Sequence, residues 1–126
     1  MTNIEKLKKA IENRKPINFE YNKAGKTVGI RKGNPHALYI FGYKDPKKES
    51  KIKLDLVQTD GVSDSDKEKP FPDFRQFFIT DLSNIEVLDN DPDFEPLYEK
   101  LNEETGEMEK RYNPESEYYK NPLAKV

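Results

Sequence analysis

The first dozen residues have the pattern of an amphipathic helix. Four apolar residues recur with the spacing of a single helix face: Ile4, Leu7, Ala10 and Ile11. Thr2 or Asn3 is expected to cap the first turn, because short polar side chains accept hydrogen bonds from its free amide groups. Pro16 is expected to end the helix, because proline disfavours a helical conformation in the residue before it. We therefore predict one N-terminal helix.

The chain then changes to the alternating pattern of β-strands, with turn residues between them. The predicted strands cover residues 17–21, 28–30, 37–44, 50–59, 74–80 and 85–88. The segment 31–35 is expected to break the pairing between the second and third strands. In the fourth strand, Ile52, Leu54 and Leu56 are expected to face the core. A helix followed by five or six short antiparallel strands predicts a mainly β (α+β) fold, a small barrel with an N-terminal helix.

The predicted barrel domain covers residues 1–90, and an acidic extension with several tyrosines and prolines covers residues 91–126. Within the barrel, the polar stretch 60–72 is long enough to be functional or mobile. Four apolar residues of the extension have helical spacing: Phe94, Leu97, Tyr98 and Leu101. The last residues, about 15 of them, show no periodicity, so we expect them to be extended or disordered, and the extension as a whole to be partly disordered.

Composition narrows the range of chemistry. Of the 126 residues, 33% are hydrophobic and 37% are charged, which predicts a small core. Cysteine is absent, which excludes disulfides, thiolate zinc sites and cysteine nucleophiles. A single histidine, His36, excludes a metal site built from histidines alone. No apolar run approaches the roughly 20 residues of a membrane span, and the start of the chain is not signal-like, so we predict a cytoplasmic protein. No cofactor is predicted.

Charge is distributed unevenly along the chain. Residues 1–60 carry 14 Lys and Arg against 7 Asp and Glu, whereas residues 61–126 carry 8 against 17. The halves therefore have net charges of +7 and –9. This asymmetry indicates either an anion-binding face beside an acidic tail or two halves that screen each other on one surface.

The stretch from Arg75 to Leu88 resembles the C-terminal signature of WYL domains, in which an arginine opens a strand with an apolar pair, followed by a turn and a short valine-rich strand. The matching positions are Arg75, Phe77, Ile79, Leu82, Ile85, Val87 and Leu88. Upstream, the helix, the strand 17–21, the turn at Gly25 and the segment 31–39 follow the same order and spacing. The resemblance covers about two thirds of the chain, residues 4–88.

The chain departs from the WYL pattern at several positions. The Trp-Tyr-Leu tripeptide is absent, and residues 38–40 are its nearest counterpart. Phe78 and Asp81 stand where two further basic residues are usual, and no helix-turn-helix domain precedes the barrel. The resemblance implies an Sm/SH3-like barrel that binds a negatively charged ligand, a nucleotide or single-stranded nucleic acid. Stand-alone modules of this kind occur in phages and other mobile elements, which is compatible with this chain.

Arg75 is the first candidate for a ligand contact. It shares the strand parity of Phe77 and Ile79, so a guanidinium opens the core-facing row and must find a partner. That partner is either a bound phosphate or carboxylate, or an internal carboxylate such as Asp73 or Asp81. A ligand role requires that no protein carboxylate neutralises this guanidinium at the rim of the barrel.

Further candidates lie between residues 31 and 36. Arg31 and Lys32 precede Gly33, where a turn can expose backbone amides to an anion, although charged strand ends are commonly just solvated. His36 is either a ligand contact or a hydrogen-bonded structural residue.

Aromatic residues on one strand face form a candidate platform for stacking bases. Tyr39, Phe41 and Tyr43 share a face, and Lys51 and Lys53 lie on the neighbouring strand. The alternative is that this face packs under the N-terminal helix.

No familiar catalytic or nucleotide-binding motif is present. Asp64, Asp66 and Glu68 lack the glycine and closing glutamate of an EF-hand, and no nucleophile–base pair can be assembled. We therefore predict a non-enzymatic, regulatory-type module that binds single-stranded nucleic acid or a nucleotide-like anion. Its predicted contacts are Arg31, Lys32, His36, Tyr39, Lys53 and Arg75. The alternative is a protein-interaction module that acts through residues 91–126.

Overall fold

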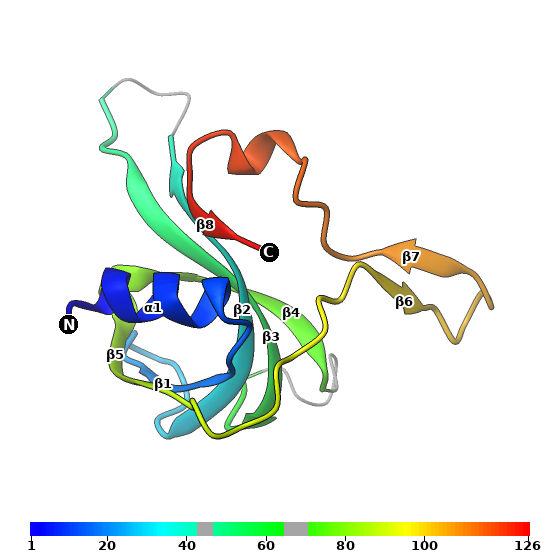
Figure 1. The fold of residues 1–126 in the computed structure, drawn as a ribbon, viewed down its shortest axis with the longest axis horizontal. Coiled ribbons are helices and arrows are strands. Elements are labelled where there is room, and N and C mark those ends of the chain that lie inside the picture. The colour runs from blue at the N-terminus through cyan, green and yellow to red at the C-terminus, as the bar shows by residue number, and fades with distance from the viewer. Residues whose placement is uncertain (43–46, 65–70) are drawn as a thin grey trace.

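The computed structural model describes residues 1–42, 47–64 and 71–126 (Figure 1). In this part of the chain the fold is mainly β, with one α-helix. Its elements are α1 (Asn3–Glu12), β1 (Ile17–Tyr21), β2 (Ile30–Phe41), β3 (Lys51–Gly61), β4 (Asp73–Phe78), the 3-10 turn η1 (Ile79–Asp81), β5 (Leu82–Val87), β6 (Glu99–Leu101), β7 (Met108–Lys110), the 3-10 turn η2 (Glu117–Tyr119) and β8 (Pro122–Lys125). All described strand pairings are antiparallel, which confirms the predicted class.

The main sheet has the strand order β4-β3-β2-β1-β5, and β8 pairs with β2 beside the end of β1. Strands β6 and β7 form a separate hairpin that projects from the sheet (Figure 1). Strands β4 and β5 end the path and are not paired with each other in the described residues. The structure therefore shows a twisted antiparallel sheet, without the pairing that would close it into a barrel.

Helix α1 covers one face of the sheet, which we call the inner face (Figure 1). The predicted helix is confirmed, and Thr2 is its cap, with Oγ1 accepting a hydrogen bond from the Glu5 amide at 3.1 Å. The buried core between helix and sheet consists of Leu7, Ala10, Ile11, Ile17, Phe19, Leu38, Leu54, Leu56, Phe77, Leu82 and Ile85. The helical and alternating patterns of the sequence thus converge on one apolar layer.

The predicted break at residues 31–35 is wrong, because β2 runs unbroken from Ile30 to Phe41. Two register shifts against β3, one of them beside Pro35, absorb the irregular residues. Pro35 lies between the stretch of β2 that pairs with β1 and the stretch that pairs with β8, so its missing N–H is tolerated. Gly33 is required by close packing, since a Cβ there would lie 2.8 Å from the carbonyl oxygen of Val57.

The extension differs from its prediction. No helix forms around Phe94, because Pro92 and Pro96 interrupt the chain on either side of it. Near the end of the extension, β8 pairs with β2 and extends the main sheet. Tyr112 and Tyr119 are buried against the sheet, so residues 91–126 form part of the folded unit in this structure.

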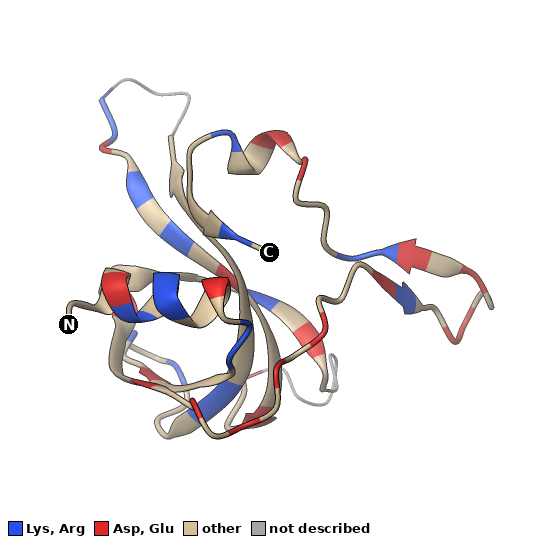
Figure 2. Cartoon of the chain, viewed as in Figure 1, with Lys and Arg blue, Asp and Glu red and all other residues tan. Residues whose placement is uncertain are grey.

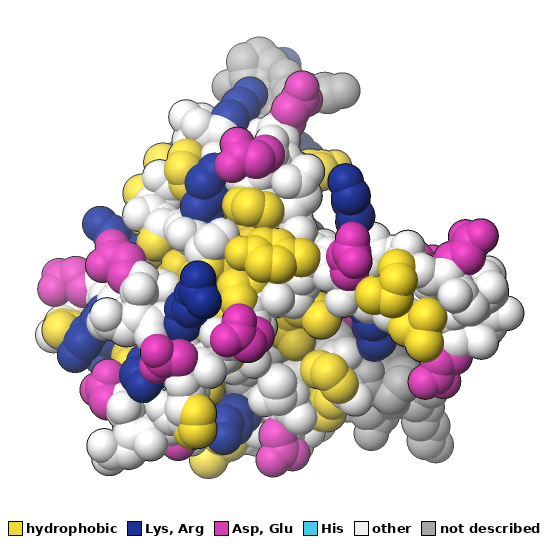
Figure 3. Space-filling model, turned by 45° about the vertical axis from the view of Figure 1, so that its right-hand side comes forward, with side chains coloured by type: hydrophobic (Ala, Val, Ile, Leu, Met, Phe, Trp, Pro, Cys, Tyr) yellow, Lys and Arg dark blue, Asp and Glu magenta, His cyan; other side chains and the backbone are white. Residues whose placement is uncertain are grey.

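The basic and acidic halves of the chain partly screen each other. Among the described residues, four ion pairs join the basic half to the acidic half: Lys9–Asp89, Lys15–Asp93, Arg31–Asp64 and Lys32–Asp91. Figure 2 shows acidic residues along the β6–β7 hairpin and lysines along β3. In the face seen in Figure 3, charges of both signs surround a central band of hydrophobic side chains. Among the described residues, no helix is long and apolar enough to span a membrane.

Candidate functional site

The face of the sheet opposite α1, which we call the outer face, is polar and aromatic. The register of β2, β3 and β4 gives four successive rows of side chains: Phe41 and Lys51; Tyr39, Lys53 and Phe78; Ala37, Asp55 and Gln76; Asn34, Val57 and Phe74. Neighbouring rows on one face are about 7 Å apart along the strands. Residues of the extension, Tyr112 and Tyr119 among them, cover the middle of this face.

Asp55 is a buried carboxylate at the centre of the outer face, with 4% of the residue exposed. Its Oδ1 accepts a hydrogen bond from the Tyr39 hydroxyl at 2.9 Å, and its Oδ2 accepts one from the Tyr119 hydroxyl at 2.6 Å. The Gln76 amide donates a longer bond to Oδ2, at 3.5 Å. Burial raises the pKa of Asp55, and these hydrogen bonds oppose the rise. Burial likewise raises the pKa values of Tyr39 and Tyr119, and the nearby carboxylate adds to both shifts.

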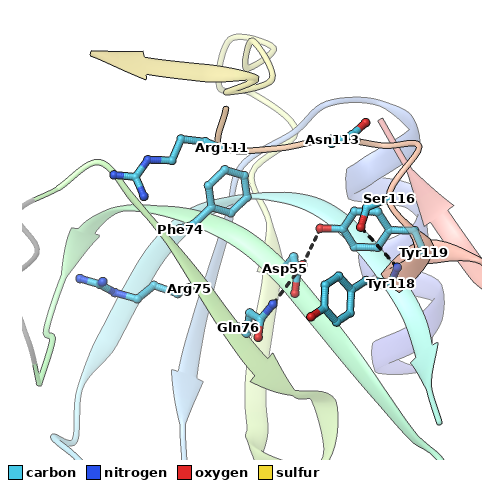
Figure 4. Close-up of a pocket in the computed structure, with 9 residues that line it drawn as sticks. All are labelled: Asp55, Phe74, Arg75, Gln76, Arg111, Asn113, Ser116, Tyr118 and Tyr119. Atoms are coloured by element: carbon cyan, nitrogen blue, oxygen red, sulfur yellow. Dashed lines mark hydrogen bonds between the residues drawn. The ribbon is translucent and has the colours of Figure 1, made fainter. Parts of the chain in front are cut away.

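A cleft of about 560 Å³ opens over Asp55, between β4 and the extension. Asp55 and Gln76 form its floor with Tyr118 beside them, whereas Phe74, Arg75 and Arg111 lie toward the other end (Figure 4). The cleft therefore has a guanidinium end and a polar floor, with an aromatic ring at each.

Two arginines approach one carboxylate at the guanidinium end. Arg75 Nη1 lies 3.3 Å from Asp73 Oδ2, and Arg75 Nη2 donates to Ser63 Oγ at 3.4 Å. Arg111 is farther from Asp73, at 3.9 Å, and keeps 35% of its side chain exposed. A ligand role for Arg75 required a guanidinium that no protein carboxylate neutralises. Asp73 neutralises it, so the structure agrees with the alternative, an internal ion pair. The predicted inward parity of Arg75 is confirmed by its pairing with Leu56.

A second, smaller hollow lies beside Arg31 and Arg75. Both line a space of about 150 Å³ that also includes Lys26. The expectation of a solvated strand end is wrong for Arg31, because only 3% of its side chain is exposed. Its Nη2 lies 3.1 Å from Asp64 Oδ2, and its guanidinium lies 5.2 Å from the Tyr21 ring centre. Hydrogen bonds from Thr27, aided by Arg31, lower the pKa of Asp64 to about 2. Asp66 and Glu68 lie outside the described residues.

Lys32 and His36 lie away from the cleft. The Lys32 amine pairs with Asp91 at 2.9 Å. His36 is fully buried: its Nδ1 lies 2.7 Å from the Asn34 carbonyl, and its Nε2 accepts from the Leu97 amide at 3.0 Å. Burial lowers the pKa of His36 to about 4, so the ring is neutral near pH 7. Because both nitrogens are occupied, the predicted ligand role of His36 is corrected to a structural one.

The predicted aromatic platform is divided by the extension. Tyr39 is only 1% exposed, because Tyr119 packs edge-on against it with ring centres 4.9 Å apart. The covering element is thus the C-terminal segment, whereas the alternative interpretation named the N-terminal helix. Lys53 remains at the surface, with Nζ 3.9 Å from the ring centre of Phe41 and 5.2 Å from that of Phe78. Tyr43 lies outside the described residues.

Of the residues that line the cleft, only Arg75 was among the predicted contacts. Sequence reasoning missed the other eight: Asp55, Phe74, Gln76, Arg111, Asn113, Ser116, Tyr118 and Tyr119. Asp55 gave one usable signal, because aspartate is depleted in strand interiors and needs a reason to be there. No local pattern places Arg111 or Tyr118, since the extension reaches the sheet only through tertiary contacts.

The described residues contain no cluster of His, Asp and Glu that could hold a metal ion. Comparison with known proteins finds no family model that matches the chain and no curated protein that matches it. The WYL resemblance therefore stays a prediction, and the chemistry of the cleft has to be argued from its own residues.

Proposed function

We propose that the protein is a non-enzymatic binding module whose outer-face cleft holds a nucleotide unit, either free or within a single-stranded nucleic acid. The observation that carries this proposal is the placement of Arg111 across one cleft from the ring of Tyr118 and a polar floor. A nucleotide has the matching parts, which are an anionic phosphate, a flat ring and hydrogen-bonding groups on that ring.

The arginine end suits a phosphate. A guanidinium offers a planar fork of donors that matches phosphate oxygens, and this fork remains charged at any physiological pH. Arg111 is the more available of the two arginines, because its contact with Asp73 is long and part of its side chain is exposed. We expect Arg75 to contribute less, because Asp73 neutralises it.

The aromatic residues suit a base. Tyr118 is 68% exposed at the cleft, and Phe74 lines it from β4. A base stacked on such a ring contributes about 1–3 kcal/mol to binding. The volume of about 560 Å³ is within the usual range for a small-molecule site.

The neighbouring rows of the outer face offer a path for further nucleotides. Lys53 and Phe78 occupy the row next to Asp55 and Gln76, and Lys51 follows in the row beyond. Alternating lysines and aromatic rings are the usual components of a single-strand groove. A strand is therefore expected to bind more tightly than a free nucleotide.

The barrel type, the regulatory role, the origin and the cellular location predicted from the sequence are part of the same proposal. A helix followed by an antiparallel sheet in which β5 returns beside β1 is compatible with the Sm/SH3-like barrel that the WYL resemblance implies. A regulatory role, a phage or mobile-element origin and a cytoplasmic location remain predictions.

The test is fluorescence anisotropy with short labelled DNA and RNA strands, repeated between about 50 and 200 mM salt. We expect affinity to fall as salt rises. In Arg111→Ala and Lys53→Ala, the slope of the logarithm of the binding constant against the logarithm of salt concentration should become shallower by about one unit. Lys8→Ala is the matched control, since Lys8 lies on α1, outside the cleft. Binding that ignores salt, or that is equal in all three variants, would contradict the proposal.

One observation favours the alternative of a protein-interaction module. Leu101 and Met108 pair across the β6–β7 hairpin and are 51% and 58% exposed, on a segment rich in glutamate. The alternative gains support if no strand or nucleotide binds while a basic protein partner binds and is lost in Leu101→Asp.

A further inference from the structure

The floor of the cleft presents hydrogen-bond acceptors. Asp55 accepts one bond at Oδ1, and a carboxylate oxygen can accept two. Gln76 turns its amide nitrogen toward Asp55, so among the described contacts its Oε1 is left as an acceptor without a donor. The hydroxyl protons of Tyr39 and Tyr119 are already donated to Asp55. Gln76 keeps a second amide N–H, so the acceptors in question are Asp55 Oδ1 and Gln76 Oε1. A ligand edge that rests on these two oxygens must bring its own donors.

Nucleobases differ in the donors on their Watson–Crick edges, and enzymes and binding proteins read these edges by hydrogen bonds. Guanine presents two adjacent donors, N1–H and the N2 amine. Adenine and cytosine each present one amine next to a ring-nitrogen acceptor, and uracil presents one N–H between two carbonyl oxygens. A carbonyl oxygen placed against Asp55 would be repelled and would leave a buried acceptor unpaired.

We infer that the cleft selects guanine, with N1–H and the N2 amine donating to Asp55 and Gln76 while the phosphate reaches toward Arg111. This inference rests on the proposed function and names its preferred base. The distance between the guanidinium and the floor supports it, because Arg111 lies on the opposite side of the cleft from Asp55 and Gln76 in Figure 4. The burial of Asp55 also supports it, since the two tyrosine hydroxyls hold the carboxylate in one orientation.

The test is competition by GMP, IMP, AMP, CMP and UMP against a bound labelled strand at fixed salt. We expect GMP to compete best, with UMP weaker by roughly 10-fold or more, the discrimination usual for a bidentate contact to a base. IMP, which lacks the N2 amine, should fall between them. Equal competition by all five nucleotides would overturn the inference and leave the proposed function standing. Failure of every strand and every nucleotide to bind would overturn both.

Two variants make the test specific to the floor. Gln76→Ala changes an exposed residue and should reduce the preference for GMP over UMP several-fold. Asp55→Asn should weaken GMP and favour XMP, whose C2 carbonyl can accept from the new amide. Tyr118→Ala is the matched control, because loss of a stacking ring should weaken all nucleotides without changing their order. A GMP preference that persists in Gln76→Ala and Asp55→Asn would contradict the assignment to this floor.

Discussion

The two faces of the β2–β3–β4 sheet are built from the same three strands and have different chemistry. The inner face is an apolar layer, in which Leu38, Leu54 and Phe77 lie side by side beneath α1. The outer face carries a buried carboxylate, lysines and aromatic rings, and the extension covers part of it. The inner face is an apolar core, whereas the outer face carries buried polar groups and the cleft.

The difference lies in where the covering residues come from. Helix α1 precedes the sheet and buries apolar side chains that would be unfavourable in water whatever the rest of the chain does. The outer face is completed by residues of the extension, such as Tyr119, which donates to Asp55 from 64 positions farther along the chain. Its polar groups are buried only because this distant segment brings the matching donors.

The largest expected effect is on the inner face. Leu54→Ala should lower the free energy of unfolding by about 2–5 kcal/mol, because Leu54 is fully buried and its truncation leaves a cavity. Urea denaturation followed by circular dichroism measures this change. A loss below about 1 kcal/mol would show that the layer under α1 is not the stabilising core.

The next effect concerns the histidine that joins the sheet to the extension. The pKa of His36 falls from an ordinary 6.5 to about 4 on folding, so the unfolded chain binds a proton first as pH falls. The free energy of unfolding should therefore decrease between pH 6.5 and pH 4, by up to about 3 kcal/mol from this group, and the contribution is fully present above pH 6.5.

The control for this pH dependence is the variant His36→Gln, because a glutamine side chain does not titrate. Urea midpoints across the pH series should converge for the two proteins as pH falls, because only the wild type loses this contribution. Parallel profiles would show that His36 is not buried in a neutral form.

A smaller effect is expected at the buried carboxylate. Tyr119→Phe removes a hydroxyl that donates to Asp55 at 2.6 Å, and should cost about 1.5–3 kcal/mol of unfolding free energy. Tyr118→Phe is the matched control, since Tyr118 is exposed, and should change stability by less than about 0.5 kcal/mol. Equal effects of the two substitutions would mean that the extension does not dock through Asp55.

The same comparison explains which features the sequence could predict. Helix α1 and the inward-facing side chains of β3 could be predicted, because an element that buries one face shows a regular spacing of apolar residues. The continuity of β2 through Pro35 could not be predicted, because it depends on which neighbouring strand ends there. Arg31 and Arg75 were identified as candidates, and Asp73 was one of the two carboxylates considered for Arg75. The partner of Arg31, Asp64, could not be predicted, because tertiary packing brings the two together.

The cleft was the hardest part to predict. Lys53 was named from its strand position, and it lies at the surface beside the cleft. Asp55 and Gln76 were not among the predicted contacts, and Arg111 reaches the cleft only because the extension folds back. Contacts between segments this far apart leave no periodic signal in either one.

The most direct test of the outer-face cleft is an NMR titration of the amide resonances with a short single strand. The account predicts shifts in residues 74–78 and 116–119, around the cleft, and none in residues 3–12 of α1. Shifts centred on α1 or on the β6–β7 hairpin, or no shifts at all, would contradict it.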